Sequence, residues 1–306
     1  MPSPRRGAAG LVALVLLALL AVVRPSSAAV DQLAVVPGIH FEPAPAVLPW
    51  GGTRVFDDHR FLVAYYGTAG SGALGVLGET GPERMHRRLT KAARPFGGPR
   101  RPVQPVYELI VTVADRHPGK RQAYSHDISR AAVQRYIDAA HEHGALLVLD
   151  IQPGHADFLT VVKRWKWALK DPWVGLALDP EWRMARGGVP GQRIGTVGAG
   201  EVNRVSQWLA TLVRNKALPE KLFVLHQFRR QMIVHPEKIV PREGLAMVQH
   251  VDGFGTPSQK LDTYHYVARP KQFAMGFKLF YDEDTPRMGA KAVLAIRPKV
   301  RFVSFQ

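Results

Sequence analysis

Residues 145–182 read ALLVLDIQPGHADFLTVVKRWKWALKDPWVGLALDPEW and contain two apolar runs with a helical pattern between them. The runs 145–150 and 173–179 are continuously apolar up to a final aspartate, as in strands that are buried on both faces. The apolar residues between the two runs recur at the spacing of a helix: Phe158, Val161, Val162, Trp165 and Leu169. A strand, a helix and a second strand in this order predict parallel pairing with a right-handed crossover.

The same unit recurs along most of the chain. We expect strands at residues 61–66, 107–113, 145–150, 173–179, 222–226, 245–251, 273–281 and 300–306. Helical patterns fall at residues 82–96, 156–170, 201–217, 258–268 and 288–296. A further helix is expected to begin at a cap on Ser125 or Asp127 and to end at Gly144. The segment after 222–226 is short and weakly patterned.

Eight strands separated by seven crossover segments, over about 250 residues, predict a (β/α)8 TIM barrel of the α/β class. We assign the barrel to residues 59–306 as one domain, with a final helix that is short or missing. A doubly wound open sheet is the alternative. The first strand is followed by Gly67-Thr-Ala-Gly-Ser-Gly72, which lacks the spacing of a phosphate-binding fingerprint and therefore weakens that alternative.

The first 29 residues have the three-part layout of a secretory signal peptide. Arg5 and Arg6 precede an apolar run at residues 11–23, and small residues follow at 26–29. We therefore expect the protein to be secreted or cell-wall associated, with membrane contact only if this segment stays uncleaved. Residues 30–58 form an N-terminal extension, which we expect either to cover the place of the missing helix or to plug the bottom of the barrel.

The composition narrows the function classes. The 306 residues are 46% hydrophobic, which is ample for a packed core, and they include no cysteine, which excludes a disulfide, a thiolate metal site and a cysteine nucleophile. A formal charge of +16 indicates either a soluble basic surface or attraction to an anionic cell-wall polymer. We recognise no nucleic-acid-binding module and expect no nucleic-acid partner.

Polar residues gather where the predicted strands end. In a TIM barrel these carboxyl ends meet on one face, where active sites are built. The polar residues at these ends are Tyr65, Tyr66, Asp115, Asp150, Gln152, Asp179, Glu181, His226, Gln227, His250, Asp252, Lys278, Asp282, Ser304 and Gln306.

The fourth predicted strand carries the strongest signal. Every second residue of 173–181 shares one face, so Asp179 and Glu181 are expected side by side, with the small residues Gly175 and Ala177 pointing into the barrel. The apolar residues between them are expected to pack against helices. Rise along a strand would separate the two acids by about 6–7 Å.

Two acids in a partly dry cleft titrate apart, so that one stays ionised and the other keeps its proton. Glycoside cleavage needs this division, because a proton must reach the leaving oxygen while a negative group stabilises the developing cation. Pro180 has no N–H group, so the strand should stop at the pair.

Asp179-Pro-Glu181 resembles the end of the Asp-x-x-Asp-x-Asp-x-Glu motif of chitinase-type glycoside hydrolases. In that family the Glu is the general acid, and the Asp two residues before it orients the N-acetyl group that acts as nucleophile. The resemblance implies Glu181 as acid and Asp179 as assisting carboxylate. Val174 and Ala177 stand where the family has its two earlier Asp residues. As a whole, the chain resembles secreted bacterial TIM-barrel proteins that are distantly similar to these enzymes.

The other residues selected at the strand ends would bind substrate, although each could instead have a structural role. They are Tyr65, Tyr66, Asp150, Gln152, Trp182, Gln227, His250, Asp252 and Lys278. The glycine-rich stretch 186–200 is expected to be a loop over the cleft or a surface insertion.

These patterns favour a monomeric, secreted glycoside hydrolase-like protein that acts on a polysaccharide or cell-wall glycan without a metal or cofactor. One alternative is a catalytically inactive barrel that binds wall polymer. The other is a metal-dependent phosphodiesterase in which Asp150, Asp179 and Glu181 hold Mg²⁺ or Ca²⁺.

Overall fold

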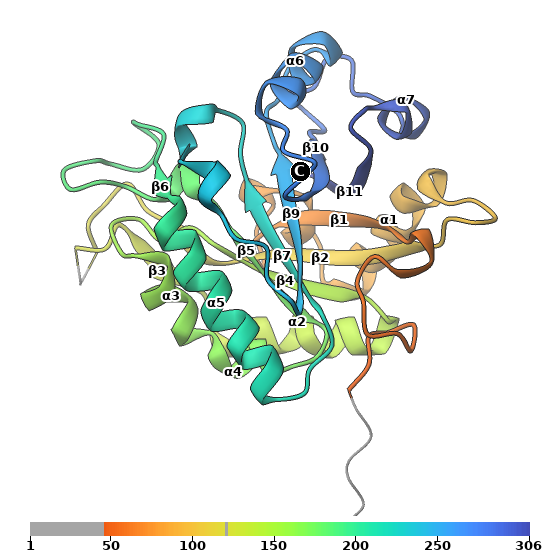
Figure 1. The fold of residues 1–306 in the computed structure, drawn as a ribbon, viewed down its shortest axis with the longest axis horizontal. Helices are drawn as coiled ribbons and strands as arrows, with labels where there is room; N and C mark the ends of the chain where they lie inside the picture. Colours follow the sequence, from red (N-terminus) through yellow and green to blue (C-terminus); the bar gives the residue numbers. More distant parts are fainter. Residues whose placement is uncertain (1–45, 120–121) are drawn as a thin grey trace, which may run out of the picture. The chain divides into compact units, whose positions relative to one another are not determined.

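The predicted strands form a closed parallel barrel with helices between them (Figure 1). The computed structural model describes residues 46–119 and 122–306. Each barrel strand pairs in parallel with the next one along the chain, and β1 pairs with both β2 and β11 to close the ring. The strands are β1 Phe61–Gly67, β2 Val103–Ala114, β4 Leu146–Ile151, β5 Val174–Leu178, β7 Lys221–His226, β9 Leu245–Val251, β10 Ala274–Leu279 and β11 Val300–Phe305.

Helices connect six of the seven strand pairs. They are α1 Pro82–Ala93, α2 Arg130–His143, α3 Phe158–Arg164, α4 Lys166–Leu169, α5 Ala199–Asn215, α6 Pro257–Val267 and α7 Ala290–Ala295. The weakly patterned connection between β7 and β9 holds two 3-10 turns and the short strand β8, Ile233–Val234, which pairs with β6, Val197–Gly198. No helix follows β11 within the described residues.

The start of α2 differs from the expectation. Ser125 and Asp127 do not cap the helix; they lie in β3, Ser125–Asp127, which pairs antiparallel with the far end of β2. The Ser129 side chain caps the helix by accepting a hydrogen bond from the Ala132 N–H. Gly144 ends the helix in the left-handed conformation, with φ of 61°, as predicted.

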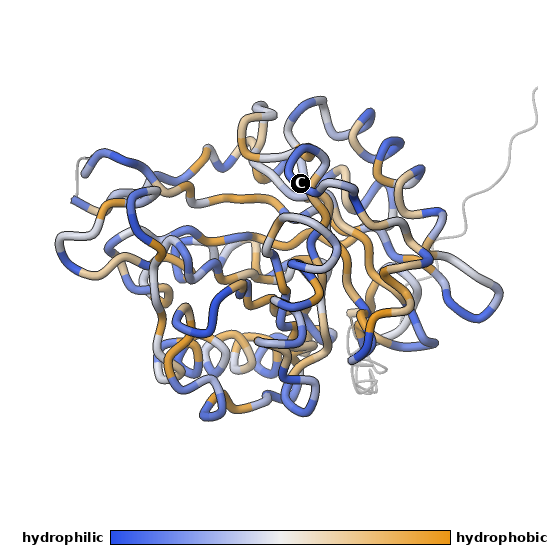
Figure 2. The backbone as a smooth tube through the Cα atoms, turned by 90° about the horizontal axis from the view of Figure 1, so that it is seen from above, coloured by the Kyte–Doolittle hydropathy of each residue, from blue (hydrophilic) through white to orange (hydrophobic). Residues whose placement is uncertain are grey.

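The alternation of β5 is as predicted within the strand. Leu176 and Leu178 belong to the large apolar layer between strands and helices, whereas Ala177 belongs to the smaller cluster inside the barrel. A Cβ atom on Gly175 would lie 2.4 Å from the Leu222 carbonyl oxygen, so only glycine fits at this point. In Figure 2, long hydrophobic stretches of the backbone tube run through the interior of the molecule.

The described part of the N-terminal extension plugs the amino-terminal end of the barrel. Leu48 and Val55 are buried in the same cluster as Leu62, Leu146 and Leu222, which lie at the starts of their strands. The Val55 N–H donates to Glu220 over 2.6 Å, and the Trp173 indole donates to the Val47 carbonyl over 2.9 Å. The first of these contacts joins the extension to the residue before β7.

The predicted signal peptide, residues 1–29, and residues 30–45 of the extension lie outside the described residues. Within residues 46–119 and 122–306, no helix has the length and apolar character that a membrane crossing requires.

Candidate active site

Every barrel strand brings a buried polar side chain toward the carboxyl end of the barrel. In strand order along the chain these are Tyr66, Glu108, Asp150, Asp179, His226, His250, Lys278 and Ser304, where Asp179 directly follows β5. Buried polar groups are stable only when they are hydrogen-bonded or paired, so their contacts reveal how the site is organised.

His226 lies at the centre of this group and is completely buried. Its Nδ1 atom lies 2.9 Å from Asp252 Oδ2, and its Nε2 atom lies 3.1 Å from Glu108 Oε1. Asp150 Oδ1 is 3.9 Å from the same Nε2 atom. Burial alone would lower the pKa of His226, but the bonds to Asp252 and Glu108 outweigh it and raise the pKa well above its usual range. Each ring nitrogen faces a carboxyl oxygen, and the ring can donate from both nitrogens only as an imidazolium, the form that the raised pKa favours.

Asp252 is held in its ionised form. Burial acts to raise its pKa, but the hydrogen bond and charge of His226, followed by the charge of Lys278, lower it below the usual value. The Lys278 ammonium lies 3.7 Å from Asp252 Oδ2, donates to Gln306 Oε1 over 3.2 Å, and sits 3.6 Å from the centre of the Tyr66 ring.

Asp150 is also held through Oδ2, the oxygen that is not the one nearest His226. The Tyr66 hydroxyl donates to Asp150 Oδ2 over 3.0 Å and accepts from Gln152 over 3.4 Å. Gln152 is fixed in turn by the Ala114 N–H, which donates to its side-chain oxygen over 3.0 Å. Burial raises the pKa of Asp150 to about 6, against the opposing charge of His226.

The predicted pair Asp179 and Glu181 straddles the end of β5. The strand stops at Leu178, and Pro180–Trp182 form a 3-10 turn. The position of Glu181 is therefore set by this turn and not by the alternation of side chains along the strand. Asp179 is 1% exposed, and its Oδ1 atom has no hydrogen-bond partner in the described part of the chain. Burial, and then the charge of Glu181, raise the pKa of Asp179 well above its usual range.

Glu181 differs from Asp179 because it borders open space. It is partly exposed and lines two adjoining cavities at the barrel mouth. Burial, and then the negative charge of Asp252, raise the pKa of Glu181 to about 7. Near neutral pH this carboxyl group can therefore hold a proton and release it.

The first cavity, which we call the central cavity, lies over the barrel and has a volume of about 570 Å³. Its wall includes these polar and aromatic side chains: Tyr66, Gln152, Glu181, Trp182, Phe228, Arg229, Asp252, Phe254, Lys278, Phe280, Glu283 and Gln306. Asp179 is not among the residues that line it. Of the two predicted catalytic acids, only Glu181 reaches the central cavity.

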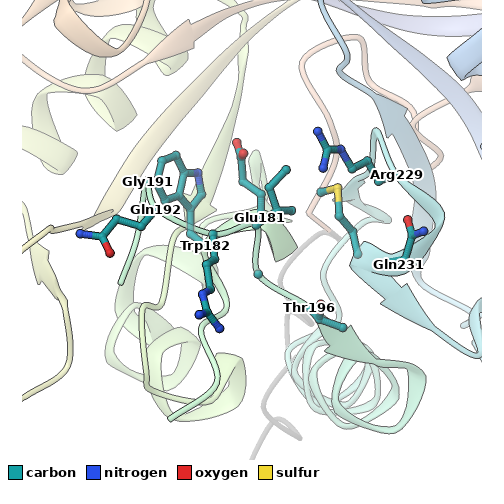
Figure 3. A pocket seen from close by; sticks show the side chains of 11 residues that line it. Glu181, Trp182, Gly191, Gln192, Thr196, Arg229 and Gln231 are labelled. Atoms are coloured by element: carbon teal, nitrogen blue, oxygen red, sulfur yellow. The ribbon is translucent and has the colours of Figure 1, made fainter. Parts of the chain in front are cut away.

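The second cavity, which we call the side cavity, adjoins the first and has a volume of about 740 Å³. The two cavities share the residues Glu181, Trp182, Ile194 and Arg229. In the view of Figure 3, Glu181 lies between Trp182 and Arg229. Residues 191–196 of the glycine-rich stretch form one wall, so this stretch borders the cleft.

The predicted substrate-binding residues divide into two groups. Tyr66, Gln152, Trp182, Asp252 and Lys278 line the central cavity, and Asp150 lies behind them, bonded to Tyr66. The other three, Tyr65, Gln227 and His250, do not line the central cavity.

Tyr65 belongs to the layer under the helices, where its hydroxyl is 3.2 Å from that of Tyr281. Gln227 accepts a hydrogen bond from Gln249 over 2.7 Å and borders a separate surface hollow. His250 is fully buried, with Nε2 2.7 Å from Ser304 Oγ. A position at a strand end does not by itself say which face of the strand a side chain is on. The prediction of these three residues rested on that position alone.

Glu108 and His226 are central to the site but are not among the predicted site residues. Glu108 lies within an apolar strand run, and His226 was noted only as a polar strand end. The available signal was a charged residue inside a strand that is otherwise apolar, because such a residue needs a buried partner.

The residues proposed for a metal in the phosphodiesterase hypothesis do not form a ligand group. Across the described ranges, the one set of acids and histidines with ligand atoms within 4.8 Å of one another is Glu83, Glu142 and His143, on α1 and α2. Asp150, Asp179 and Glu181 are not such a set, so their placement gives the metal hypothesis no support.

Comparisons with known protein families and with curated proteins find no match to this sequence. The fold and the site therefore define the class by themselves. The protein is a (β/α)8 barrel with a carboxylate-rich cleft at the carboxyl ends of its strands.

Proposed function

We propose that this barrel is a secreted or cell-wall-associated glycoside hydrolase that acts on a polysaccharide or cell-wall glycan, with Glu181 as general acid. The observation that carries the proposal is the position of Glu181. It is a carboxyl group at the boundary of two open cavities, and burial with the nearby Asp252 raises its pKa to about 7. A general acid works best when its pKa lies near the operating pH.

The reaction would begin with proton transfer from the Glu181 carboxyl group to the glycosidic oxygen. The bond between this oxygen and the anomeric carbon then breaks, and the leaving sugar departs as an alcohol. A water molecule adds its oxygen to the anomeric carbon and returns one proton to the Glu181 carboxylate. The net change is hydrolysis of one glycosidic bond, with Glu181 restored.

Asp252 is the group best suited to stabilise positive charge at the anomeric carbon. It lines the central cavity and stays ionised because His226 and Lys278 lie beside it. Asp179 is less suited to the assisting role that the resemblance implies, because it does not line the central cavity and burial raises its pKa well above its usual range, which disfavours its charged form. A protonated Asp179 can donate a hydrogen bond, but it offers no negative charge.

The test is Glu181→Gln, assayed on cell-wall polysaccharides and on a series of aryl glycosides. We expect turnover on polysaccharides to fall by at least about 100-fold, because loss of acid catalysis typically costs this much. Aryl glycosides with acidic leaving groups need little protonation, so they should lose much less. A structural defect would lower turnover of both substrate types equally.

Glu243→Gln is the matched control, because Glu243 is exposed and precedes β9 at the opposite end of the barrel. The control should retain wild-type turnover. Full polysaccharide turnover in Glu181→Gln would overturn the proposal. Retained glycan binding without turnover in the wild-type protein would favour the inactive wall-binding alternative.

A further inference from the structure

The side cavity differs from the central cavity in charge. Three acids, Glu181, Asp252 and Glu283, line the central cavity together with Lys278 and Arg229. The side cavity is lined by Arg193 and Arg229, and Glu181, at the boundary, is its one acidic lining residue. The two neighbouring spaces therefore differ in the ligands that their walls favour.

The two arginines are free to bind an external partner. Arg193 and Arg229 are both exposed, and neither forms an ion pair with an acid in residues 46–119 and 122–306. A guanidinium group presents several N–H donors in a plane, which matches the two oxygens of a carboxylate or phosphate. Two such groups that line one cavity favour an anionic ligand.

The loops that carry the arginines are tied to the site and to each other. The Gly195 N–H donates to the Glu181 carbonyl over 2.6 Å, and the Thr196 N–H donates to the Arg183 carbonyl over 2.9 Å. The chain then enters β6, which pairs with β8. β8 directly follows the 3-10 turn Arg230–Met232, and this turn begins after Arg229. The two segments that carry Arg193 and Arg229 are thus joined by backbone hydrogen bonds, and one of them is bonded to the backbone of Glu181.

The remaining lining residues suit a sugar unit. Gln192, Thr196 and Gln231 offer neutral hydrogen-bonding groups, and Trp182 offers an aromatic face beside Glu181 (Figure 3). A cavity of about 740 Å³ has room for a sugar ring with its substituent.

We propose that the side cavity is a subsite for a glycan unit that carries an anionic group, a carboxylate or a phosphate, next to the unit that is cleaved. Arg193 and Arg229 would bind the anionic group, and Trp182 would contact the ring. The inference rests on the proposed function for the order of the subsites, but the binding itself requires no turnover. This subsite would be the position at which the basic protein distinguishes an acidic polymer from a neutral one.

The experiment measures binding to Glu181→Gln, so that no probe is consumed. The probes are a galacturonic acid pentamer, its fully methyl-esterified form, and a glycerol phosphate oligomer of matched length, each titrated by calorimetry. We expect the acid or the phosphate oligomer to bind at least about 10-fold more tightly than the neutral ester. Which of the two binds more tightly identifies the anionic group.

The second arm adds Arg193→Gln and Arg229→Gln together. Affinity for the anionic probe should fall about 10-fold or more, while affinity for the ester should stay unchanged. Arg135→Gln, on the exposed face of α2, is the charge-matched control and should change neither.

Three results would overturn the subsite. They are equal affinity for acid and ester, no binding of either anionic probe, and an equal loss of affinity in the Arg135→Gln control. A failure of the proposed hydrolysis would be visible separately, as absent turnover in the wild-type protein with these binding results intact.

Discussion

His226 Nδ1 lies 2.9 Å from Asp252 Oδ2, and both side chains are buried at the barrel mouth. The other ring nitrogen faces Glu108 at 3.1 Å, so one imidazolium ring serves two carboxylates from different strands. This arrangement keeps Asp252 ionised within the same site where Asp179 and Glu181 are driven toward their protonated forms. The proposed general acid, Glu181, and the proposed ionised group, Asp252, therefore differ in protonation because their neighbours differ.

The first prediction concerns the stability of a variant in which His226, the cation shared by two acids, is replaced. His226→Gln is expected to lower the free energy of unfolding by about 3–5 kcal/mol, because it removes the buried cation that contacts both Asp252 and Glu108 and leaves Asp252 with Lys278 alone. Urea denaturation near neutral pH measures the change.

His235→Gln provides the matched control, since His235 is exposed and pairs only with Glu237 at the surface. It should change the free energy of unfolding by less than about 1 kcal/mol. Similar small losses in both variants would show that His226 does not hold the charge network together.

The second prediction concerns pH. Because the acid must be protonated to act, turnover should decline as the pH rises through about 7, the pKa of Glu181. Asp252 is the first charged neighbour that raises this pKa, so Asp252→Asn should shift the titration of Glu181 to lower pH. Carboxyl ¹³C NMR follows the titration directly, even if the variant has no turnover.

Asp262→Asn, on the exposed face of α6, tests whether any loss of negative charge has this effect. The Glu181 titration should not move in this variant. An unchanged Glu181 titration in Asp252→Asn would remove Asp252 from the proposed pairing.

The barrel could be predicted from the sequence because its strands are buried on both faces. Runs such as 145–150 are apolar up to a final aspartate, and the helical patterns between runs leave few ways to connect them. The position of Glu181 could be predicted less well, because the alternation of β5 ends at Leu178 and a turn containing Pro180 takes over. The expectation that Asp179 and Glu181 share one face rested on a strand that does not extend that far.

The buried charge network was beyond sequence reasoning for a different reason. Glu108 and His226 are 118 residues apart, and Asp252 is 26 residues beyond His226. Only closure of the barrel brings β2, β7 and the end of β9 to one point. No local pattern in the sequence indicates that these three residues are in contact.

The third prediction uses the linkage between protonation and folding. The pKa of Asp150 is about 6 in the folded protein against 3.8 for the ordinary side chain. The folded state therefore binds more protons than the unfolded state between these values, and stability falls as the pH rises through this window. Asp150 should contribute on the order of 3 kcal/mol to this loss, and Asp150→Asn should remove that share. The slope that remains in the variant belongs to Glu181 and Asp179, whose pKa values are also raised.

Unfolding by urea at a series of pH values, from about 4 to about 7, measures this slope. Asp138→Asn removes an exposed acid on α2 and should keep the slope of the wild-type protein. Parallel slopes in the wild-type protein and Asp150→Asn would mean that Asp150 is not held near protonation by its surroundings.

The last prediction tests the close approach of two strands beneath the site. A Cβ atom on Gly175 would lie 2.4 Å from the Leu222 carbonyl oxygen, which is fixed in the backbone of β7. Gly175→Ala should therefore push β5 from β7 and lower the free energy of unfolding by about 1–3 kcal/mol. Gly289→Ala is the control, because a Cβ atom there meets nothing within 4 Å. Since β5 leads directly into Asp179 and Glu181, Gly175→Ala should also reduce turnover more than Gly289→Ala does, and equal stability of the two variants would contradict the tight β5–β7 contact.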